Sequence, residues 1–70
     1  MEKNIIKTFI STEFNNLKKE FYYNSDIHEK NENFIYDYVL NKNIVNQKWF
    51  DNRLKYTYEE ILKELLIKVM

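Results

Sequence analysis

Apolar residues recur at helical spacing through the first part of the chain. From Ile5 to Phe21 they follow the i, i+3 and i+4 pattern, and the polar residues fall mostly on the other faces. This pattern predicts a helix that ends near Tyr23 and begins at either Ile5 or Ser11. In the second case Ser11 caps the helix, and residues Lys3 to Ile10 form an extended arm. The apolar stripe consists of Ile5, Ile6, Phe9, Ile10, Phe14, Leu17 and Phe21.

Two short polar segments divide the middle of the chain. Because the sequence contains neither Gly nor Pro, its turns must rely on Asn, Asp and Ser. The first such segment is Asn24 to Asp26, in which Ser25 or Asp26 is expected to cap a second helix. The second is Leu40 to Asn43, whose length suits a tight helix-turn-helix connection. A third helix is predicted from about Ile44 to Lys55. The second helix carries the apolar residues Ile27, Phe34, Ile35, Tyr38 and Val39.

The last segment has its own helix signals. Thr57 and Glu60 stand three positions apart as in a capping box, which predicts a break near Tyr56 and a fourth helix after it. The apolar stripe of this helix needs something to pack against. It either folds back onto the core of the same domain or contacts another protein, in a dimer or in a groove of a partner. The candidate partner-binding residues are Tyr58, Ile61, Leu62, Leu65, Leu66 and Val69.

Length and composition limit the range of functions. Seventy residues suffice for one small domain, and the 44% hydrophobic content is enough for a compact helical core. The chain has no Cys, and its single His28, expected as a surface or cap residue, cannot form a zinc site alone. There is no nucleophile–base pair, Gly-rich phosphate loop or metal-ligand spacing. We therefore expect no enzyme, no cofactor, no metal and no small-molecule substrate.

Charge and hydropathy also bear on location and partners. No apolar run approaches the roughly 18 residues that span a membrane, and the N-terminus lacks the regions of a signal peptide. We expect an intracellular protein that is neither secreted nor membrane-bound. The net charge is zero, from 11 Lys and Arg against 11 Asp and Glu, which argues against strong electrostatic binding of DNA by the whole chain.

The only Trp of the chain lies within a short run of polar residues. On a helix, Val45, Trp49 and Phe50 fall on one side, and Asn52 points to another. A buried aromatic anchor of this kind holds a short amide outward, where it can meet a base edge in a DNA groove. The same arrangement also suits an ordinary surface helix.

The run Trp49 to Arg53 resembles the recognition helix of a homeodomain. The spacing of 28 positions from Phe21 to Trp49 is that of the family. The resemblance covers about residues 6–56 without net insertion. Its further matching positions are Phe9, Phe14, Leu17 and Asn24 in the first helix and the residues next to it, and Ile27, Ile35 and Val39 in the second helix.

The resemblance implies an all-α fold: a three-helix, homeodomain-like helix-turn-helix over residues 1–56, with an added C-terminal amphipathic helix over residues 57–70. It implies a nuclear transcriptional regulator that binds double-stranded DNA sequence-specifically, with its third helix in the major groove. Asn52 would contact adenine and Arg53 would hold phosphate. The other implied DNA-binding residues are Lys48 and Asp51 for base preference, Lys55 for phosphate, and Lys3 and Lys7 in the N-terminal arm.

The chain departs from the family in its charges. Residues 2–7 contain only Lys3 and Lys7 as basic residues, and the segment after Arg53 lacks the strongly basic run of the family. An alternative function is therefore a small helical protein-interaction module or inhibitor, cytoplasmic, that does not bind DNA. Salt dependence separates the two, because DNA binding weakens steeply with salt and an apolar helix contact does not.

Overall fold

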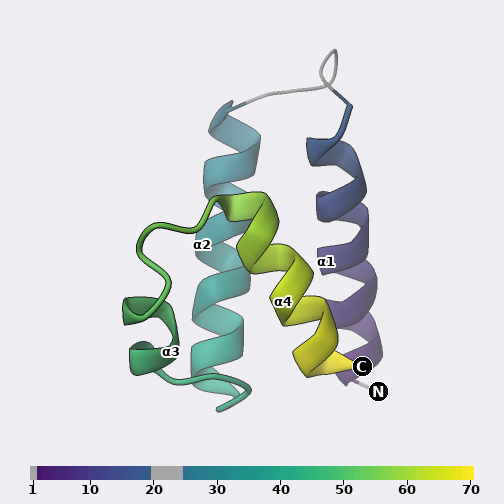
Figure 1. Cartoon of the computed structure of the whole chain (residues 1–70). Coiled ribbons are helices and arrows are strands. Elements are labelled where there is room, and N and C mark those ends of the chain that lie inside the picture. The colour runs from purple at the N-terminus through teal and green to yellow at the C-terminus, as the bar shows by residue number, and fades with distance from the viewer. Residues whose placement is uncertain (1, 20–24) are drawn as a thin grey trace.

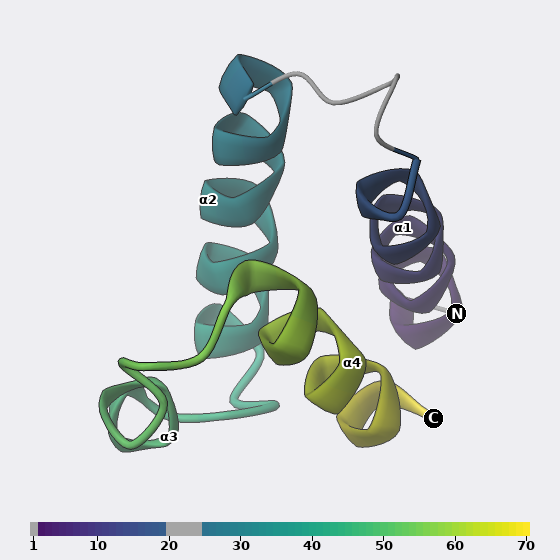
Figure 2. The same cartoon turned by 45° about the horizontal axis from the view of Figure 1, so that its top comes forward.

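The computed structural model describes residues 2–19 and 25–70. Over these ranges the chain forms four helices and no strands: α1 (Glu2–Leu17), α2 (Ser25–Asn41), α3 (Gln47–Asp51) and α4 (Tyr58–Val69). The predicted all-α class is therefore confirmed. Figure 1 shows α4 lying across α1 and α2, and Figure 2 shows the short α3 on the side of α2 that is remote from α1. None of the described helices combines the length and apolar character needed to cross a bilayer.

Helix α1 starts before the alternative capping site at Ser11. It runs without interruption from Glu2 to Leu17, so the later start and the extended arm are wrong. Ile6 and Ile10 are one turn apart and almost fully buried, whereas Ile5 is 72% exposed. The first helix therefore begins early because its inward face already carries apolar residues. Phe21, Tyr23 and Asn24, which the sequence placed in the helix or its exit, lie outside the described residues.

The core lies where α4 crosses the other two long helices. All three contribute fully buried aliphatic side chains, each of which stabilises the fold by roughly 1.5–3 kcal/mol on burial. Of the two alternatives for the C-terminal stripe, the structure takes the first: α4 folds back onto its own domain. The buried apolar residues are Ile6, Ile10, Ile35, Val39, Val45, Ile61, Leu62, Leu65 and Val69.

The inward face of α2 differs from the predicted one. Ile35 and Val39 are fully buried as expected, but Ile27 is 54% exposed. His28 is 7% exposed instead, since it stands two full turns before Ile35 and shares its face. The prediction of Ile27 as a core residue and of His28 as a surface or cap residue is therefore wrong.

The turn after α2 depends on a left-handed residue. Asn43 has φ of 56°, a conformation that Asn tolerates better than most residues. With the chain reversed there, the Ile44 amide donates to the Val39 carbonyl at 2.9 Å. Val45 is thereby brought into the core, where it is 7% exposed.

The predicted third helix is much shorter than expected. It covers only Gln47 to Asp51, with the Asn46 side chain accepting a hydrogen bond from the Trp49 amide at its start. Asn52 ends it as the C-cap, so the prediction of one helix from Ile44 to Lys55 is wrong.

The break before α4 is confirmed. The Thr57 hydroxyl accepts from the Glu60 amide at 3.2 Å, and the Thr57 amide donates to the Glu60 carboxylate at 2.9 Å. These reciprocal bonds form the predicted capping box. The hydrogen bond from the Thr57 amide also lowers the pKa of the Glu60 carboxyl, because it stabilises the ionised form.

Candidate functional site

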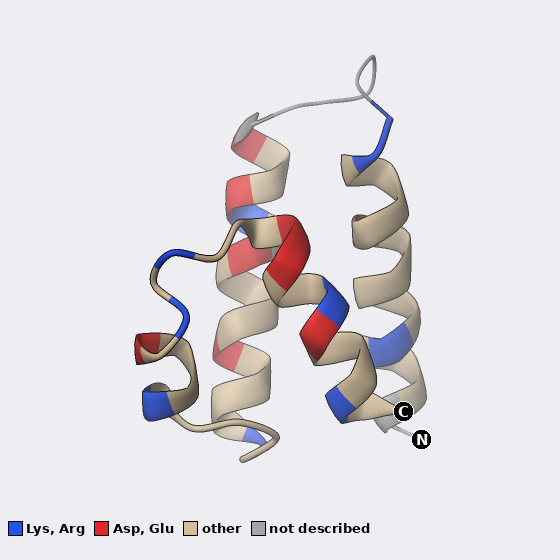
Figure 3. Cartoon of the chain, viewed as in Figure 1, with Lys and Arg blue, Asp and Glu red and all other residues tan. Residues whose placement is uncertain are grey.

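The predicted base-contacting residues lie on α3 and in the segment that follows it. Lys48, Asp51, Asn52 and Lys55 are all exposed. The Asp51 carboxylate accepts a hydrogen bond from the Gln47 side chain at 3.1 Å. It adds a negative charge close in sequence to Lys48 and Lys55. Figure 3 shows acidic and basic residues next to each other on α3, rather than a uniformly basic face.

The two lysines predicted for the N-terminal arm are elsewhere. Lys7 is exposed on α1, and Lys3 belongs to the same helix, although its side chain is outside the described part of the chain. Both cartoon views place α1 and α3 on opposite sides of the molecule (Figures 1 and 2). The structure therefore does not bring Lys3 and Lys7 together with the residues around Asn52.

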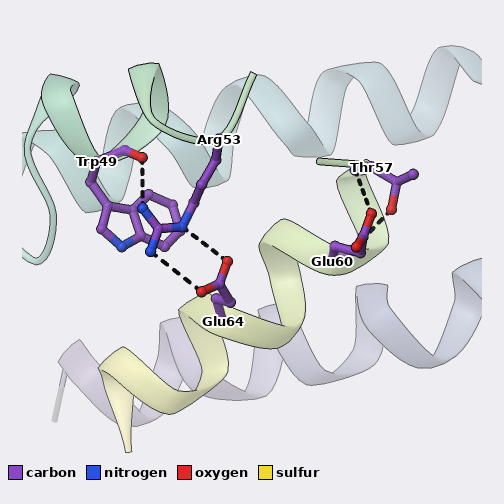
Figure 4. A network of polar contacts seen from close by, with 5 residues as sticks. All are labelled: Trp49, Arg53, Thr57, Glu60 and Glu64. Carbon is purple, nitrogen blue, oxygen red and sulfur yellow. Dashed lines mark hydrogen bonds and ion pairs between the residues drawn. The ribbon is translucent and has the colours of Figure 1, made fainter. Parts of the chain in front are cut away.

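Arg53 holds the end of α3 against α4. Its guanidinium donates to both carboxylate oxygens of Glu64, at 2.9 and 3.3 Å, and to the Trp49 carbonyl at 2.9 Å (Figure 4). It also stacks over the Trp49 ring, 4.0 Å from its centre. The side chain predicted to hold phosphate is thus engaged within the chain, where it connects two helices.

The candidate partner-binding stripe of α4 is inside the molecule. Ile61, Leu62, Leu65 and Val69 are at most 4% exposed. Tyr58 and Leu66 are half-buried and pack against the same core. The four buried residues of the stripe therefore have almost no accessible surface for a partner, and their prediction as an interface is wrong, whereas Tyr58 and Leu66 remain partly exposed.

A buried polar network joins the three long helices. The Glu13 carboxylate accepts from the Tyr58 hydroxyl at 2.7 Å, from His28 Nδ1 at 3.0 Å and from the Asn31 amide at 3.1 Å. Glu13 is 3% exposed. Burial, followed by the hydrogen bond to Glu13, raises the pKa of the Tyr58 hydroxyl above its ordinary value. The polar residues of this helix were expected mostly on its other faces, but Glu13 follows Ile10 by three positions and lies on the buried face.

A hollow lined by aromatic residues lies between α2, α3 and the segment after α3. We name it the aromatic groove; its volume is about 340 Å³. Tyr36 and Phe50 are in ring contact in its wall, with their centres 4.5 Å apart. Leu54 and Tyr56 are 83% and 46% exposed beside it. Its lining residues are Glu32, Tyr36, Leu40, Gln47, Phe50, Arg53, Leu54, Tyr56 and Ile61.

A second hollow adjoins the aromatic groove through Glu32, which lines both. We name it the acidic hollow; its volume is about 410 Å³, and Glu29, Glu32 and Glu59 line it together with Leu17, His28, Thr57 and Tyr58. Burial, and then the charge of Glu29, raises the pKa of Glu32. Figure 3 shows acidic residues concentrated in the N-terminal half of α2, near the acidic first turn of α4, with one further acidic residue, Asp37, in the C-terminal half.

Neither hollow was predicted from the sequence. The segment after Arg53 was considered only for its lack of basic residues, although the two large apolar residues Leu54 and Tyr56, which flank Lys55, indicate an apolar surface. Tyr36 and Glu32 carried no such signal, because their importance depends on where α3 returns toward α2.

The chain was compared with protein-family models, curated proteins and solved structures. No protein-family model, no curated protein and no solved structure matches it. The homeodomain resemblance therefore depends on the sequence of residues 6–56 alone, and the case for a function depends on the surfaces of the fold.

Proposed function

We propose that this domain is a protein-interaction module that binds a short segment of another protein in the aromatic groove. The observation that carries the proposal is the exposure of Leu54 and Tyr56, at 83% and 46%, beside a hollow walled by Tyr36 and Phe50. A single exposed apolar residue is ordinary. Two of them beside a hollow with further apolar residues in its wall are typical of a site that another molecule covers.

The size of the two hollows fits a peptide segment. At about 340 and 410 Å³, each accommodates one or two side chains, and small-molecule pockets begin at a similar volume. A linear segment can place one side chain in each hollow, because they meet at Glu32. A partner surface without protruding side chains would leave both unfilled.

The geometry around α3 gives less support to DNA binding. Affinity for DNA depends on the neutralisation of phosphates by Lys and Arg. Arg53 is held by Glu64, and the Asp51 carboxylate lies close in sequence to the exposed Lys48 and Lys55. The five-residue α3 also presents a much shorter surface than the predicted twelve-residue helix of Ile44 to Lys55.

Peptide selection followed by NMR tests the proposal. Random peptides are displayed, selected on the whole domain and titrated into the ¹⁵N-labelled protein. We expect the largest shift changes at Tyr36, Phe50, Leu54 and Tyr56. The double substitution Leu54→Ser and Tyr56→Ser should weaken binding by about tenfold or more, with thermal stability retained. Ile67→Ser is the matched control, because Ile67 is 67% exposed on α4 and lines neither hollow.

Two results would contradict this function. One is a set of selected peptides whose shifts map away from the aromatic groove. The other comes from fluorescence anisotropy on a duplex with a TAAT core, the site that the homeodomain resemblance implies, and on a scrambled duplex. If the first duplex is preferred in a salt-dependent way and Asn52→Ala removes the preference, DNA binding replaces our proposal.

A further inference from the structure

We propose that the segment bound in the aromatic groove is basic, with a Lys or Arg side chain whose cationic group lies at Glu32, between the aromatic groove and the acidic hollow. This inference rests on the proposed function and adds the chemical class of the partner. It follows from the position of Glu32, the charge around it and the aromatic rings beside it.

The position of Glu32 connects the two hollows along one face of α2. Glu29, Glu32 and Tyr36 are spaced by three and four residues, so they succeed one another on that face. Glu59, in the first turn of α4, lines the acidic hollow together with Glu29 and Glu32. A side chain that leaves the aromatic groove at Glu32 therefore enters a region with carboxylates on both α2 and α4.

The carboxylates in this region are uncompensated. Within residues 2–19 and 25–70, the side chains of Glu29, Glu32 and Glu59 make no hydrogen bond or ion pair, whereas those of Glu13 and Glu64 do. Arg53 also lines the aromatic groove, but Glu64 and the Trp49 ring engage its guanidinium. Burial and the neighbouring Glu29 raise the pKa of Glu32, so this carboxylate gains from a cation placed next to it.

The aromatic residues favour the same kind of ligand. Lys and Arg side chains pack their methylene stems on apolar surfaces while the charged group reaches a polar one. Tyr and Phe rings also attract cations at their faces. The aromatic groove offers Tyr36, Phe50 and Tyr56 for the stem, and Glu32 for the charge.

A further hollow, between α1 and α2, lacks this complementarity. Phe9 and Ile5 line it, and Phe9 also contacts the half-exposed Phe34, with ring centres 5.2 Å apart. Its one carboxylate is that of Glu13, which already accepts hydrogen bonds from Asn31, His28 and Tyr58. Among the described residues that line this hollow, no charged group is free to attract a charged side chain of a partner. The proposed cation site is therefore at the aromatic groove and the acidic hollow.

The test compares three versions of one peptide that binds in the aromatic groove. Its Lys and Arg positions are made all Lys, all Gln or all Glu, and each version is titrated at low and high salt. We expect the Lys version to bind about tenfold more tightly than the Gln version at low salt, with a smaller gap at high salt, and the Glu version to bind most weakly.

Protein variants localise the effect. Glu32→Gln should reduce the preference for Lys over Gln to less than about threefold, mainly because the Lys version binds more weakly. Asp37→Asn is the matched control. It removes the same charge from an exposed position of the same helix that lines neither hollow, and it should keep the full preference.

The outcomes separate this inference from the function on which it rests. If selected peptides bind in the aromatic groove without enrichment of Lys or Arg, or if Glu32→Gln leaves the preference intact, the inference is wrong and the interaction function stands. If peptides do not bind in the aromatic groove at all, both are wrong.

Discussion

Glu13 is the residue through which the three long helices are fixed relative to one another. Its buried carboxylate accepts hydrogen bonds from His28 and Asn31 of α2 and from Tyr58 of α4. A buried charge is unfavourable unless its hydrogen bonds are satisfied. Only a few relative positions of α1, α2 and α4 bring these three donors to one carboxylate. The network therefore favours the observed packing over alternative arrangements of the helices and also stabilises it.

Removing this acceptor tests its contribution. We expect Glu13→Ala to lower the free energy of unfolding by about 2–4 kcal/mol, because it leaves buried donors on His28, Asn31 and Tyr58. Glu13→Gln should have a smaller effect, since its amide oxygen still accepts. Urea denaturation followed by circular dichroism measures both. The exposed Asn33→Ala serves as the control, with a change below about 0.5 kcal/mol. Equal urea midpoints for Glu13→Ala and the native chain would show that the network does not stabilise the fold.

The inward position of Glu13 could be predicted from the sequence only in part. Its place between Ile10 and Leu17 on the apolar stripe was available from helical spacing. Its partners were not, because His28 and Tyr58 are 15 and 45 positions away along the chain. A polar residue is buried only when distant donors meet it, and spacing within one helix contains no information about them.

At the scale of helices, the sequence predicted features that depend on residues within one turn, but it did not predict features that depend on packing between helices. Thr57 and Glu60 formed the predicted capping box, since both partners of each hydrogen bond lie within one turn. The length of α3 was mispredicted. Asn52 ends the helix, and Arg53 turns toward Glu64, eleven positions further on. Arg53 is also separated in role from the other predicted DNA-binding residues. Its pairing with Glu64 depends on how α4 packs, which the sequence around Arg53 does not indicate.

The connection between α3 and α4 makes its own prediction. Arg53→Ala should lower the free energy of unfolding by about 1–2 kcal/mol, since it removes a partly exposed ion pair and the stacking on Trp49. Arg53→Lys should recover only part of this, because Lys cannot bond both Glu64 oxygens and the Trp49 carbonyl in the same planar geometry. Thermal denaturation measures the losses, and Lys55→Ala is the control at a nearby exposed cation.

A double-mutant cycle identifies the partner of Arg53. Arg53→Ala and Glu64→Gln should be non-additive, with a coupling energy of about 0.5–1 kcal/mol. Additive losses would mean that the two side chains do not stabilise each other in solution. Arg53 would then be available to a phosphate, as the homeodomain resemblance implies.

In the whole molecule, the three long helices form the core, whereas α3 and the segment after it form, beside α2, the surface that carries the aromatic groove. The three long helices enclose the aliphatic core and the Glu13 network. The short α3 packs only partly against them, through Trp49 and Phe50. Because the chain must return from α3 to the start of α4, residues 52–56 cross the surface beside α2. The aromatic groove lies at that crossing, which is why neither the sequence pattern of α2 nor that of α3 predicted it.

The whole fold should lose stability in alkaline solution. Burial is the main cause that raises the pKa of both Tyr36 and Tyr58 above their ordinary value near 10. The folded chain therefore holds these two protons more tightly than the unfolded chain does. Their contribution is complete below the unfolded pKa, and it is lost as the pH rises through and beyond that value.

Urea midpoints measured between about pH 8 and pH 11 test this sign. We expect the midpoint to fall progressively above about pH 10, and Tyr58→Phe to reduce the slope, because a side chain without a hydroxyl has no proton to lose. Tyr58→Phe should also lower stability at neutral pH by about 1–2 kcal/mol, since Glu13 loses a donor. A midpoint that stays constant across this range would mean that both hydroxyls ionise as readily in the folded chain as in the unfolded one. The packing of α4 over α1 and α2 would then be looser than the 2.7 Å contact between Tyr58 and Glu13 requires.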